Sequence, residues 1–396
     1  MTDLASYRIG TAVPNNKSLL MSDYVAIPFN DLGRVFSRFQ DPLEDAILTA
    51  SRSGWWLNGK QGSKFAEEFA NFVGVKHCLN VANGTDALEL ALRALSILRG
   101  PIASEVITVA NAGGYTSTAC RQVGLVPVYV DVEASSHLLD IDAAVAELNA
   151  QTLVVVATHL YGGAVDIRAL RAKMNAAGFS GVPILEDCAQ AHGASVNGAL
   201  TGSMGEVATF SFYPTKNLGA MGDGGAVVTS DDNIASTIKK LQQYGWSSKY
   251  AIGLPGGRNS RMDELQAAVL TVLLPHLPSL NAERLAIRKK YSEAMPSSVN
   301  MVDGGDGAVA HLVVIESDDR DGLRAHLSNN GIATDIHYPI LDGAQAGWRN
   351  LPMRTAKGGI ITSEKITKRI VSLPCFPGLT EKETDRVCAA LSDWKS

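Results

Sequence analysis

The chain has 396 residues, of which 46% are hydrophobic and 19% are charged, and its formal net charge at pH 7 is −5. This length exceeds one typical domain, and the composition is that of an ordinary globular protein. The acidic balance leaves no basic surplus that would bind nucleic acid through its phosphates. We therefore expect two domains of unequal size and no nucleic-acid partner.

The amino-terminal residues lack the cationic start and apolar core of a secretory signal. The longest apolar run, from Leu265 to Leu280, is interrupted by Pro275, His276 and Pro278, so we expect no membrane-spanning helix. The five cysteines are scattered and form no CxxC pair, which favours neither a disulfide framework nor a zinc site. Together these features predict a cytoplasmic protein that needs no metal.

Residues 1–23 have the mixed composition of an amino-terminal arm. After the helices expected at 43–51 and 62–73, short apolar strands alternate with helices. The expected strands are 78–82, 105–109, 126–130, 153–157, 183–186, 208–212 and 226–229. The helices between and after them are expected at 86–98, 115–123, 141–149, 167–177 and 263–274. This alternation predicts a mostly parallel sheet covered by helices on both faces, within a large domain over residues 24–275.

The pattern changes after Pro275. A long charged helix is expected over 280–293, followed by a strand at 310–315 and a helix at 320–329. A further strand near 334–337 and a last helix at 381–395 complete the chain. We interpret residues 276–396 as a smaller α+β domain.

In open parallel sheets, ligands bind beyond the carboxyl ends of the strands, and several chemically notable residues follow strands here. The segment Asn83–Gly84–Thr85 joins the first strand to a helix, with Thr85 as the expected N-cap. The free N–H groups of a helix start suit a phosphate group. A plain capped helix would have the same sequence, so the motif alone leaves both interpretations open.

Asp187 comes directly after the apolar strand 183–186. A carboxylate at this place can pair with a cationic ring nitrogen and keep an aromatic ring electron-poor. A metal site is the competing interpretation, because Asp187, Cys188 and His192 are all metal-ligand types. This mixed set has no recognised metal spacing, so ring pairing is favoured.

Lys216 follows another strand, in a turn announced by Pro214, with the hydroxyl of Ser211 five residues upstream. An amine held at the edge of a rigid sheet can form a Schiff base with a carbonyl cofactor such as pyridoxal phosphate. The glycine-rich run 219–225 precedes a strand instead of following one. It therefore fails the dinucleotide template, and an oxidoreductase is disfavoured.

The polar loop 253–263 enters a helix and carries Arg258, Asn259 and Arg261. These side chains can bind an anion, and an ordinary surface loop is the equal alternative.

Seven sequence segments occur in a fixed order along the chain. Together they identify a family more specifically than any single segment does. They are SGWWLNGK, VANGTDALELALRAL, THLYGG, ILEDCAQAHGA, FSFYPTKNLGAMGDGGAV, NSRMDELQAAVL and IHYPI. From about Tyr24 to its end, the chain resembles the DegT/DnrJ/EryC1/StrS family of pyridoxal phosphate-dependent nucleotide-sugar aminotransferases. The resemblance implies the aspartate aminotransferase-like fold (fold type I), with a mostly parallel seven-stranded sheet between helices and a smaller carboxyl-terminal α+β domain.

The resemblance also implies roles for individual residues. Lys216 matches the lysine that holds the cofactor as an internal aldimine and then moves protons, and Asp187 matches the acid paired with the ring nitrogen. The other implied cofactor contacts are Gly84, Thr85 and Ser211 to the phosphate, Gln190 to the phenolic oxygen, Tyr115 to the ring face, and Asn259 to the phosphate of a neighbouring subunit. The last contact implies a homodimer with shared active sites. The sequence ANAGGY departs from the family's sequence pattern at the Ala-Gly-Gly that precedes Tyr115.

The implied substrates are glutamate and a nucleotide-linked keto-deoxysugar, with dTDP as the nucleotide. The run YGWSSKY, residues 244–250, favours amination at C3 over C4. Tyr213, His337 and Tyr338 are candidate substrate contacts, and packing is the alternative for each. Family members with His at the lysine position are dehydratases, so Lys216 favours amino transfer over a pyridoxal-dependent sugar dehydratase. Retention of the lysine and the acid argues against a non-catalytic sensor or regulatory protein.

Overall fold

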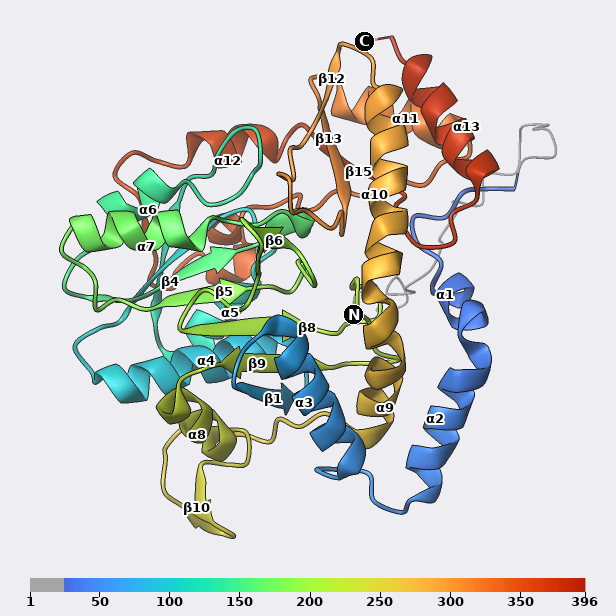
Figure 1. Cartoon of the computed structure of the whole chain (residues 1–396). Coiled ribbons are helices and arrows are strands. Elements are labelled where there is room, and N and C mark those ends of the chain that lie inside the picture. Colours follow the sequence, from blue (N-terminus) through green and yellow to red (C-terminus); the bar gives the residue numbers. More distant parts are fainter. Residues whose placement is uncertain (1–24, 396) are drawn as a thin grey trace, which may run out of the picture.

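The structure, a computed structural model, describes residues 25–395, so the predicted arm over residues 1–23 lies outside the described part of the chain. A large twisted sheet forms the centre of the molecule, with helices on both faces, and a smaller α+β unit lies at one end (Figure 1). This is the predicted α/β fold class.

The sheet has the order β1-β9-β8-β5-β4-β2-β3-β14. Its strands are β1 (His77–Val81), β2 (Glu105–Val109), β3 (Val126–Val130), β4 (Thr152–Thr158), β5 (Ile184–Asp187), β8 (Val207–Ser211), β9 (Gly225–Thr229) and β14 (Arg354–Thr355). The pairs from β8 to β14 are parallel, and β9 is antiparallel to both β8 and β1.

The predicted number of seven strands is wrong by one. The eighth strand, β14, has two residues and pairs with β3 from the carboxyl-terminal third of the chain. A two-residue strand has no alternating or apolar pattern that a sequence could reveal. The strand predicted near 334–337 is also wrong, because only Asp335 forms a bridge there, to Ser372.

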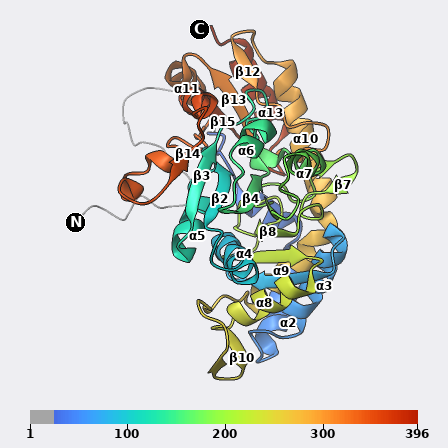
Figure 2. The same cartoon turned by 90° about the vertical axis from the view of Figure 1, so that its left-hand side faces the viewer.

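Helices cover the two faces of the sheet as separate layers, which Figure 2 shows edge-on. One layer consists of α4 (Gly84–Arg99), α5 (Tyr115–Val123) and α8 (Asp232–Leu241). The opposite layer consists of α6 (Ile141–Ala146) and α7 (Ile167–Ala176), with α2 (Gln40–Arg52), α3 (Lys60–Val73) and α9 (Glu264–Leu273) towards the β8–β9 side. Both faces of the sheet are covered, so the strands β2, β4 and β9 are buried along their whole length and are mostly apolar.

The start of α4 corrects one prediction. Asn83, not Thr85, is the N-cap: its backbone is extended, and its side chain accepts a hydrogen bond from the N–H of Asp86 at 2.8 Å. Asn is preferred over Thr at the N-cap, and the helix begins after Asn83 instead of after Thr85. Gly84 is consequently the first helical residue, and Ala82 and Asn83 connect it to β1.

The smaller unit is an antiparallel sheet with two helices. Its elements are β12 (Val299–Met301), β13 (Val313–Ser317), β15 (Ile370–Leu373), α11 (Arg320–Asn329) and α13 (Glu381–Ser392). Val313, Leu323, Val371 and Val387 of these elements form a hydrophobic cluster, to which Ile27 and residues of the connecting helix also contribute. The division of the chain at residues 275/276 stays a prediction.

The two parts are connected by a 30-residue helical stretch, Glu264–Glu293, in which α9 and α10 (Leu277–Glu293) are joined by a short 3₁₀ turn. By length and composition alone this stretch could cross a membrane. Half of its most apolar part is buried inside the protein. The helix α9 packs against α2 and α3, as a core helix does. Pro278 stands in the first turn of α10, where proline is tolerated, so α10 begins earlier than predicted.

The remaining elements are short and peripheral. They are α1 (Leu32–Arg38), β6 (Ser195–Val196), β7 (Ala199–Leu200), β10 (Trp246–Ser248), β11 (Ala251–Ile252) and α12 (Ile361–Ile366).

Candidate active site

Lys216 lies in the loop between β8 and β9, as the sequence predicts. Its backbone N–H donates to the carbonyl of Tyr213 at 2.8 Å, and Phe212 closes the base of the loop with a 2.8 Å hydrogen bond to Gly224. The loop therefore presents Lys216 at the carboxyl end of a strand in the middle of the sheet.

Asp187 is the last residue of β5, the strand beside β8, where it pairs in register with Thr209. Its side chain is 5% exposed and accepts one hydrogen bond in the described chain, from the N–H of Ala189 at 3.2 Å. Adjacent strand ends thus bring the predicted lysine and the predicted acid to one edge of the sheet.

Burial shifts the pKa values of Lys216 and Asp187 in opposite directions, and the charge of each side chain opposes the shift of the other. Burial lowers the pKa of Lys216 to about 8, and the Asp187 carboxylate opposes that shift. Burial raises the pKa of Asp187, against the hydrogen bond from Ala189 and the charge of Lys216. A buried carboxylate with so little compensation favours a further cation beside it.

Gly84 and Ser211 lie in contact at the start of α4. A Cβ atom placed on Gly84 would be 2.6 Å from the Cβ of Ser211, so the strand end and the helix start touch only because residue 84 lacks a side chain. Thr85 follows in the first helical turn. A helix start, a hydroxyl and a close backbone approach together form a suitable anion site.

Gln190 connects the loop after β4 to the segment that carries Tyr338. Its Oε1 accepts from the N–H of Tyr161 at 2.8 Å, and its Nε2 donates to the hydroxyl of Tyr338 at 2.9 Å. The ring of Tyr338 meets that of Tyr115 edge to face, with centroids 6.1 Å apart. The candidate substrate residue Tyr338 is therefore in direct contact with two candidate cofactor residues.

His337 is held beside Tyr338 by its own contacts. Its Nδ1 and the hydroxyl of Ser372 are 2.9 Å apart, and its carbonyl accepts a hydrogen bond from Tyr161. Its ring stacks on Phe29 at 5.6 Å. Tyr213 is partly buried within the Lys216 loop.

Asn259 does not contact the other candidate site residues within one described chain. Its side chain is exposed, and its backbone forms a bridge to Gln243. Arg258, which the sequence suggests as an anion ligand, already forms ion pairs with Asp86 and Glu89 of α4. The next residue, Ser260, is buried and accepts a hydrogen bond from the N–H of Ala82 at 3.1 Å.

A buried amide network holds the Lys216 loop, and the sequence analysis missed it. Asn217 donates to the Oδ1 of Asn281 at 2.8 Å, and its own Oδ1 lies 2.8 Å from the Nδ1 of His311. Asn281 in turn donates to the carbonyl of His192 at 2.9 Å. Lys216 is thereby fixed to α10 and to the chain before β13. The only sequence signal was a histidine within the apolar run 308–315.

The metal alternative does not gain support in the described residues. The ligand-type side chains that do meet are His159, Glu186 and Cys188, not the set of Asp187, Cys188 and His192. His159 accepts from the N–H of Val165 at 2.9 Å, so its other nitrogen donates to Glu186 at 3.0 Å.

Glu186 also accepts backbone N–H groups from Gly202, Met204 and Gly205. Burial would raise the pKa of Glu186, but the bond from His159 and these N–H groups hold it below its usual value. Glu186 and His159 therefore act as an internal brace whose polar atoms already have partners.

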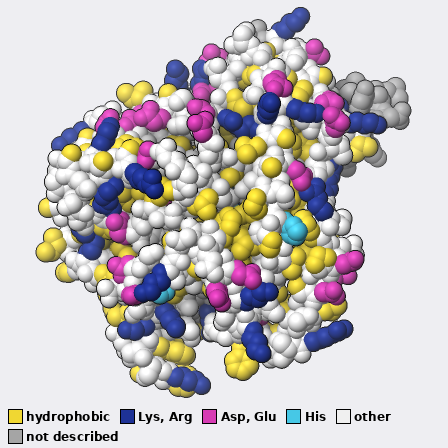
Figure 3. Space-filling model, viewed as in Figure 1, with side chains coloured by type: hydrophobic (Ala, Val, Ile, Leu, Met, Phe, Trp, Pro, Cys, Tyr) yellow, Lys and Arg dark blue, Asp and Glu magenta, His cyan; other side chains and the backbone are white. Residues whose placement is uncertain are grey.

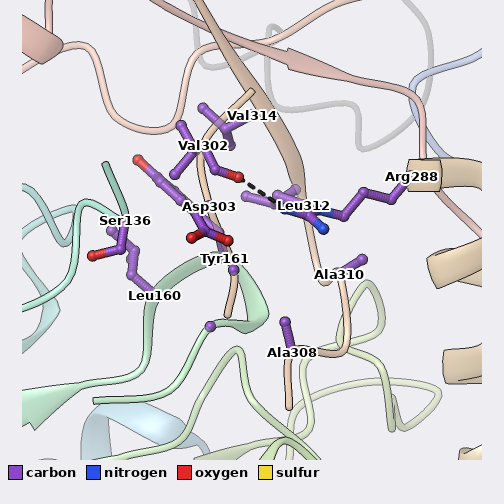
Figure 4. A pocket seen from close by; sticks show the side chains of 12 residues that line it. Ser136, Leu160, Tyr161, Arg288, Val302, Asp303, Ala308, Ala310, Leu312 and Val314 are labelled. Carbon is purple, nitrogen blue, oxygen red and sulfur yellow. Dashed lines mark hydrogen bonds between the residues drawn. The ribbon is translucent and has the colours of Figure 1, made fainter. Parts of the chain in front are cut away.

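Two cavities lie near the site. The one in Figure 4, beside Tyr161 and Arg288, has a volume of about 10 Å³ and has room for about one water. A larger cavity of about 410 Å³ is lined by Lys216, Asn217 and apolar residues of α1, α2, α9 and α10. Figure 3 shows apolar side chains gathered on this face over α9 and the lower part of α10.

The residues fit a pyridoxal cofactor by their chemistry. The buried carboxylate of Asp187 has one hydrogen bond among the described residues and suits a protonated ring nitrogen. The amine of Lys216 has a lowered pKa and suits a carbonyl carbon. The contact of Gly84 with Ser211 suits the phosphate.

Comparison with known proteins gives the same result. Residues 40–392 match the profile of the DegT/DnrJ/EryC1/StrS aminotransferase family. The chain is 36% identical, over 90% of its length and 96% of the relative's, to a dTDP-3-amino-3,4,6-trideoxy-α-D-glucose transaminase of Micromonospora megalomicea. It is 35% identical, over 94% and 98%, to a UDP-N-acetyl-3-dehydro-α-D-glucosamine 3-aminotransferase of Acidithiobacillus ferrooxidans.

The fold agrees as well. The structure of DesV from S. venezuelae in complex with a ketimine intermediate superposes with a TM-score of 0.87 at 35% identity, covering 94% of this chain and 99% of that one. The match spans both the sheet that carries Lys216 and the smaller carboxyl-terminal unit. The chain therefore belongs to the DegT/DnrJ/EryC1/StrS aminotransferase family, and it is a pyridoxal phosphate-dependent enzyme with the aspartate aminotransferase-like fold.

Proposed function

We propose that this enzyme moves an amino group from glutamate to C3 of a dTDP-linked keto-deoxysugar. The observation that carries the proposal is the placement of Asp187 at the end of β5 and of Lys216 in the loop after the neighbouring strand β8, with the pKa of Lys216 lowered to about 8 as proton transfer needs. Both relatives named above act at C3 by their names, one on a dTDP sugar and one on a UDP sugar. The run YGWSSKY, which includes β10, supports C3 over C4.

Pyridoxal phosphate, when bound, supplies a carbonyl that accepts the amino group and a ring that delocalises the electron pair left at the amino acid carbon. Lys216 would hold it and, once released, take the proton from the glutamate α-carbon. A base with a pKa near 8 is close to optimal for this transfer at neutral pH. Asp187 would hold a proton on the ring nitrogen, Gly84, Thr85 and Ser211 would bind the phosphate, and Gln190 the phenolic oxygen.

On the sugar side, His337 and Tyr338 form one wall of the proposed site. The hydroxyl of Tyr338 already lies 2.9 Å from Gln190, so a sugar that contacts this residue would be adjacent to the cofactor. Tyr213 would complete the site from the Lys216 loop. Tyr115 would lie on the ring face.

We also propose a cytoplasmic homodimer with shared active sites. Large apolar side chains are exposed at Trp55 (66%), Trp56 (58%), Tyr250 (78%) and Ile252 (70%), and burial in a subunit interface would remove this apolar surface from water. Asn259 follows the β10–β11 hairpin and is exposed, so it is available to a neighbouring subunit's phosphate group.

The proposed function is tested with a panel of dTDP- and UDP-linked sugars that carry a keto group at C3 or at C4. We expect glutamate-dependent amination of the C3-keto dTDP sugar, detected by the mass of the product. Incubation with glutamate alone should release one equivalent of 2-oxoglutarate per site, and the mass of the sugar product distinguishes amination from dehydration. Preferential amination of a C4-keto sugar would contradict the C3 assignment.

The lowered pKa of Lys216 predicts how reconstitution depends on pH. Only the neutral amine attacks a carbonyl, so the rate at which apoprotein binds pyridoxal phosphate covalently should rise with pH and reach half its maximum near pH 8. Stopped-flow absorbance between pH 6 and 10.5 measures it. A midpoint at the ordinary lysine value of 10.5 would show that burial does not activate this residue.

Gly84→Ala should weaken cofactor binding. The added Cβ would be 2.6 Å from the Cβ of Ser211, and neither backbone segment can move without opening the phosphate site. We expect a loss of about tenfold or more in affinity, the size of one charged hydrogen bond. Gly358→Ala, where an added Cβ meets nothing within 4 Å, is the matched control; equal affinities in the two variants would place the phosphate elsewhere.

A further inference from the structure

The run ANAGGY, residues 110–115, forms a turn with two consecutive glycines before α5. Gly113 and Gly114 both have positive φ angles, +79° and +83°, a conformation that favours glycine. A Cβ on Gly113 would be 3.0 Å from the ring of Tyr338, and one on Gly114 would be 2.8 Å from the ring of Trp348. The two glycines thus allow the segment 338–348 to lie directly against the start of α5.

Asp342 joins these two segments. Its side chain is fully buried, with Oδ1 accepting from the N–H of Gly114 at 2.7 Å and Oδ2 accepting from the hydroxyl of Ser117 at 3.0 Å. The hydroxyls of Ser117 and Tyr129 are 2.9 Å apart, and the N–H of Asp342 donates to the carbonyl of Ala110 at 2.7 Å. The helix α5 begins at Tyr115 after a glycine, which has no side chain to cap it, and Asp342 supplies a carboxylate from a distant part of the chain.

This contact fixes Tyr115 relative to Tyr338. Tyr115 is the first residue of α5, directly after the bonded Gly114, and Tyr338 lies four residues before Asp342. Their rings meet edge to face, and Tyr338 is bonded to Gln190. Movement of the Gly114 turn would therefore displace the aromatic ring that faces the cofactor and the tyrosine that faces the sugar together.

We propose that Asp342 is a positioning residue, which holds Tyr115 against the cofactor ring by anchoring Gly114 and Ser117 to the segment that carries Tyr338. The inference rests on the proposed function, because it places Tyr115 on the ring face. Asp342 itself touches neither the cofactor nor the substrate. Its effect passes through the turn that it holds.

The test compares Asp342→Asn with wild-type holoenzyme in the half-reaction with glutamate, and records the visible circular dichroism of the bound cofactor. We expect the variant to retain the cofactor, to show an altered dichroism band and to react about tenfold more slowly, because the amide has one accepting oxygen and cannot accept from both the Gly114 N–H and the Ser117 hydroxyl. In a Tyr115→Leu background the same substitution should change the rate less than twofold, because the residues act as one unit.

Asp131→Asn is the matched control. Asp131 also caps a helix from a distant segment, accepting from the N–H groups of Thr362 and Ser363 and from the Ser363 hydroxyl, each at 2.8 Å, and it lies outside the proposed site. It should lower the unfolding midpoint without changing the dichroism band or the rate. Ser117→Ala removes one of the two bonds to Asp342 and should give a smaller loss of about threefold, which keeps the test valid if Asp342→Asn does not fold.

A rate and a dichroism band equal to wild type in Asp342→Asn would overturn the positioning role, as would an undiminished tenfold loss in the Tyr115→Leu background. If Asp342→Asn does not fold, an unchanged band and rate in Ser117→Ala would overturn it. Failure of wild-type enzyme to react with glutamate would instead overturn the proposed function, and this inference with it.

Discussion

Lys216→Ala is expected to bind pyridoxal phosphate reversibly and to transfer no amino group in either half-reaction. The substitution removes both the covalent anchor and the base that moves the proton. Loss of the base alone is expected to cost about 10²–10⁴-fold. Among the described residues, Lys216 is the lysine whose charge lowers the pKa of Asp187. Single-turnover absorbance with glutamate measures the first half-reaction directly.

Two additions make this experiment specific. Added methylamine should restore part of the rate to Lys216→Ala, because a small amine can enter the space that the side chain leaves. Lys289→Ala, which removes an exposed lysine of α10 whose side chain is 77% exposed, should behave as wild type. Turnover by Lys216→Ala within tenfold of wild type would disprove the assignment.

Asp187→Asn is expected to fold normally and to lose about 10²–10³-fold in the rate of proton removal, the effect of removing one preorganised electrostatic group. The amide has the same shape, but it carries no charge that could keep a ring nitrogen protonated. The rate should fall in both half-reactions, since both pass electrons into the same ring. Pre-steady-state absorbance gives each rate, and Asp232→Asn, at an exposed acid paired with Lys76 and His77, is the control.

Asp187→Asn should lower the reaction rate but should not lower the stability of the apoprotein. Because burial raises the pKa of Asp187 in the folded protein, its contribution favours folding at low pH and is lost as the pH rises from about 3.9, its unfolded value, through its raised folded value. Asparagine has no such loss. At pH 7 the apo form of Asp187→Asn should therefore unfold at the same temperature as wild type or higher, and a much lower midpoint would indicate that the carboxylate has a structural role instead.

The sequence predicted those parts of the fold that depend on local pattern. The strands β2 and β3 and the helices α5 and α11 have the predicted bounds, because an apolar strand followed by a turn and an amphipathic helix is visible in a short window. Lys216 and Asp187 were predicted from their places after strands, and the structure brings them together because β5 and β8 are neighbours in the sheet.

The contacts that the sequence did not predict join residues far apart in the chain. Asp342 and Gly114 are 228 positions apart, and His311 and Asn217 are 94 positions apart. Neither pair has a local pattern, and each depends on how the smaller unit lies against the large sheet. The Ala-Gly-Gly run was noted in the sequence as unlike the family pattern. Its physical reason is the close approach of the Tyr338 and Trp348 rings, which only the three-dimensional structure shows.

The central claim is that Lys216 holds the cofactor. Reduction of the holoenzyme with sodium borohydride, followed by proteolysis and mass spectrometry, tests it most directly. The account predicts a pyridoxyl phosphate group on the peptide that contains Lys216 and on no other. A modified lysine elsewhere in the chain, or an unmodified protein after incubation with excess cofactor, would contradict it.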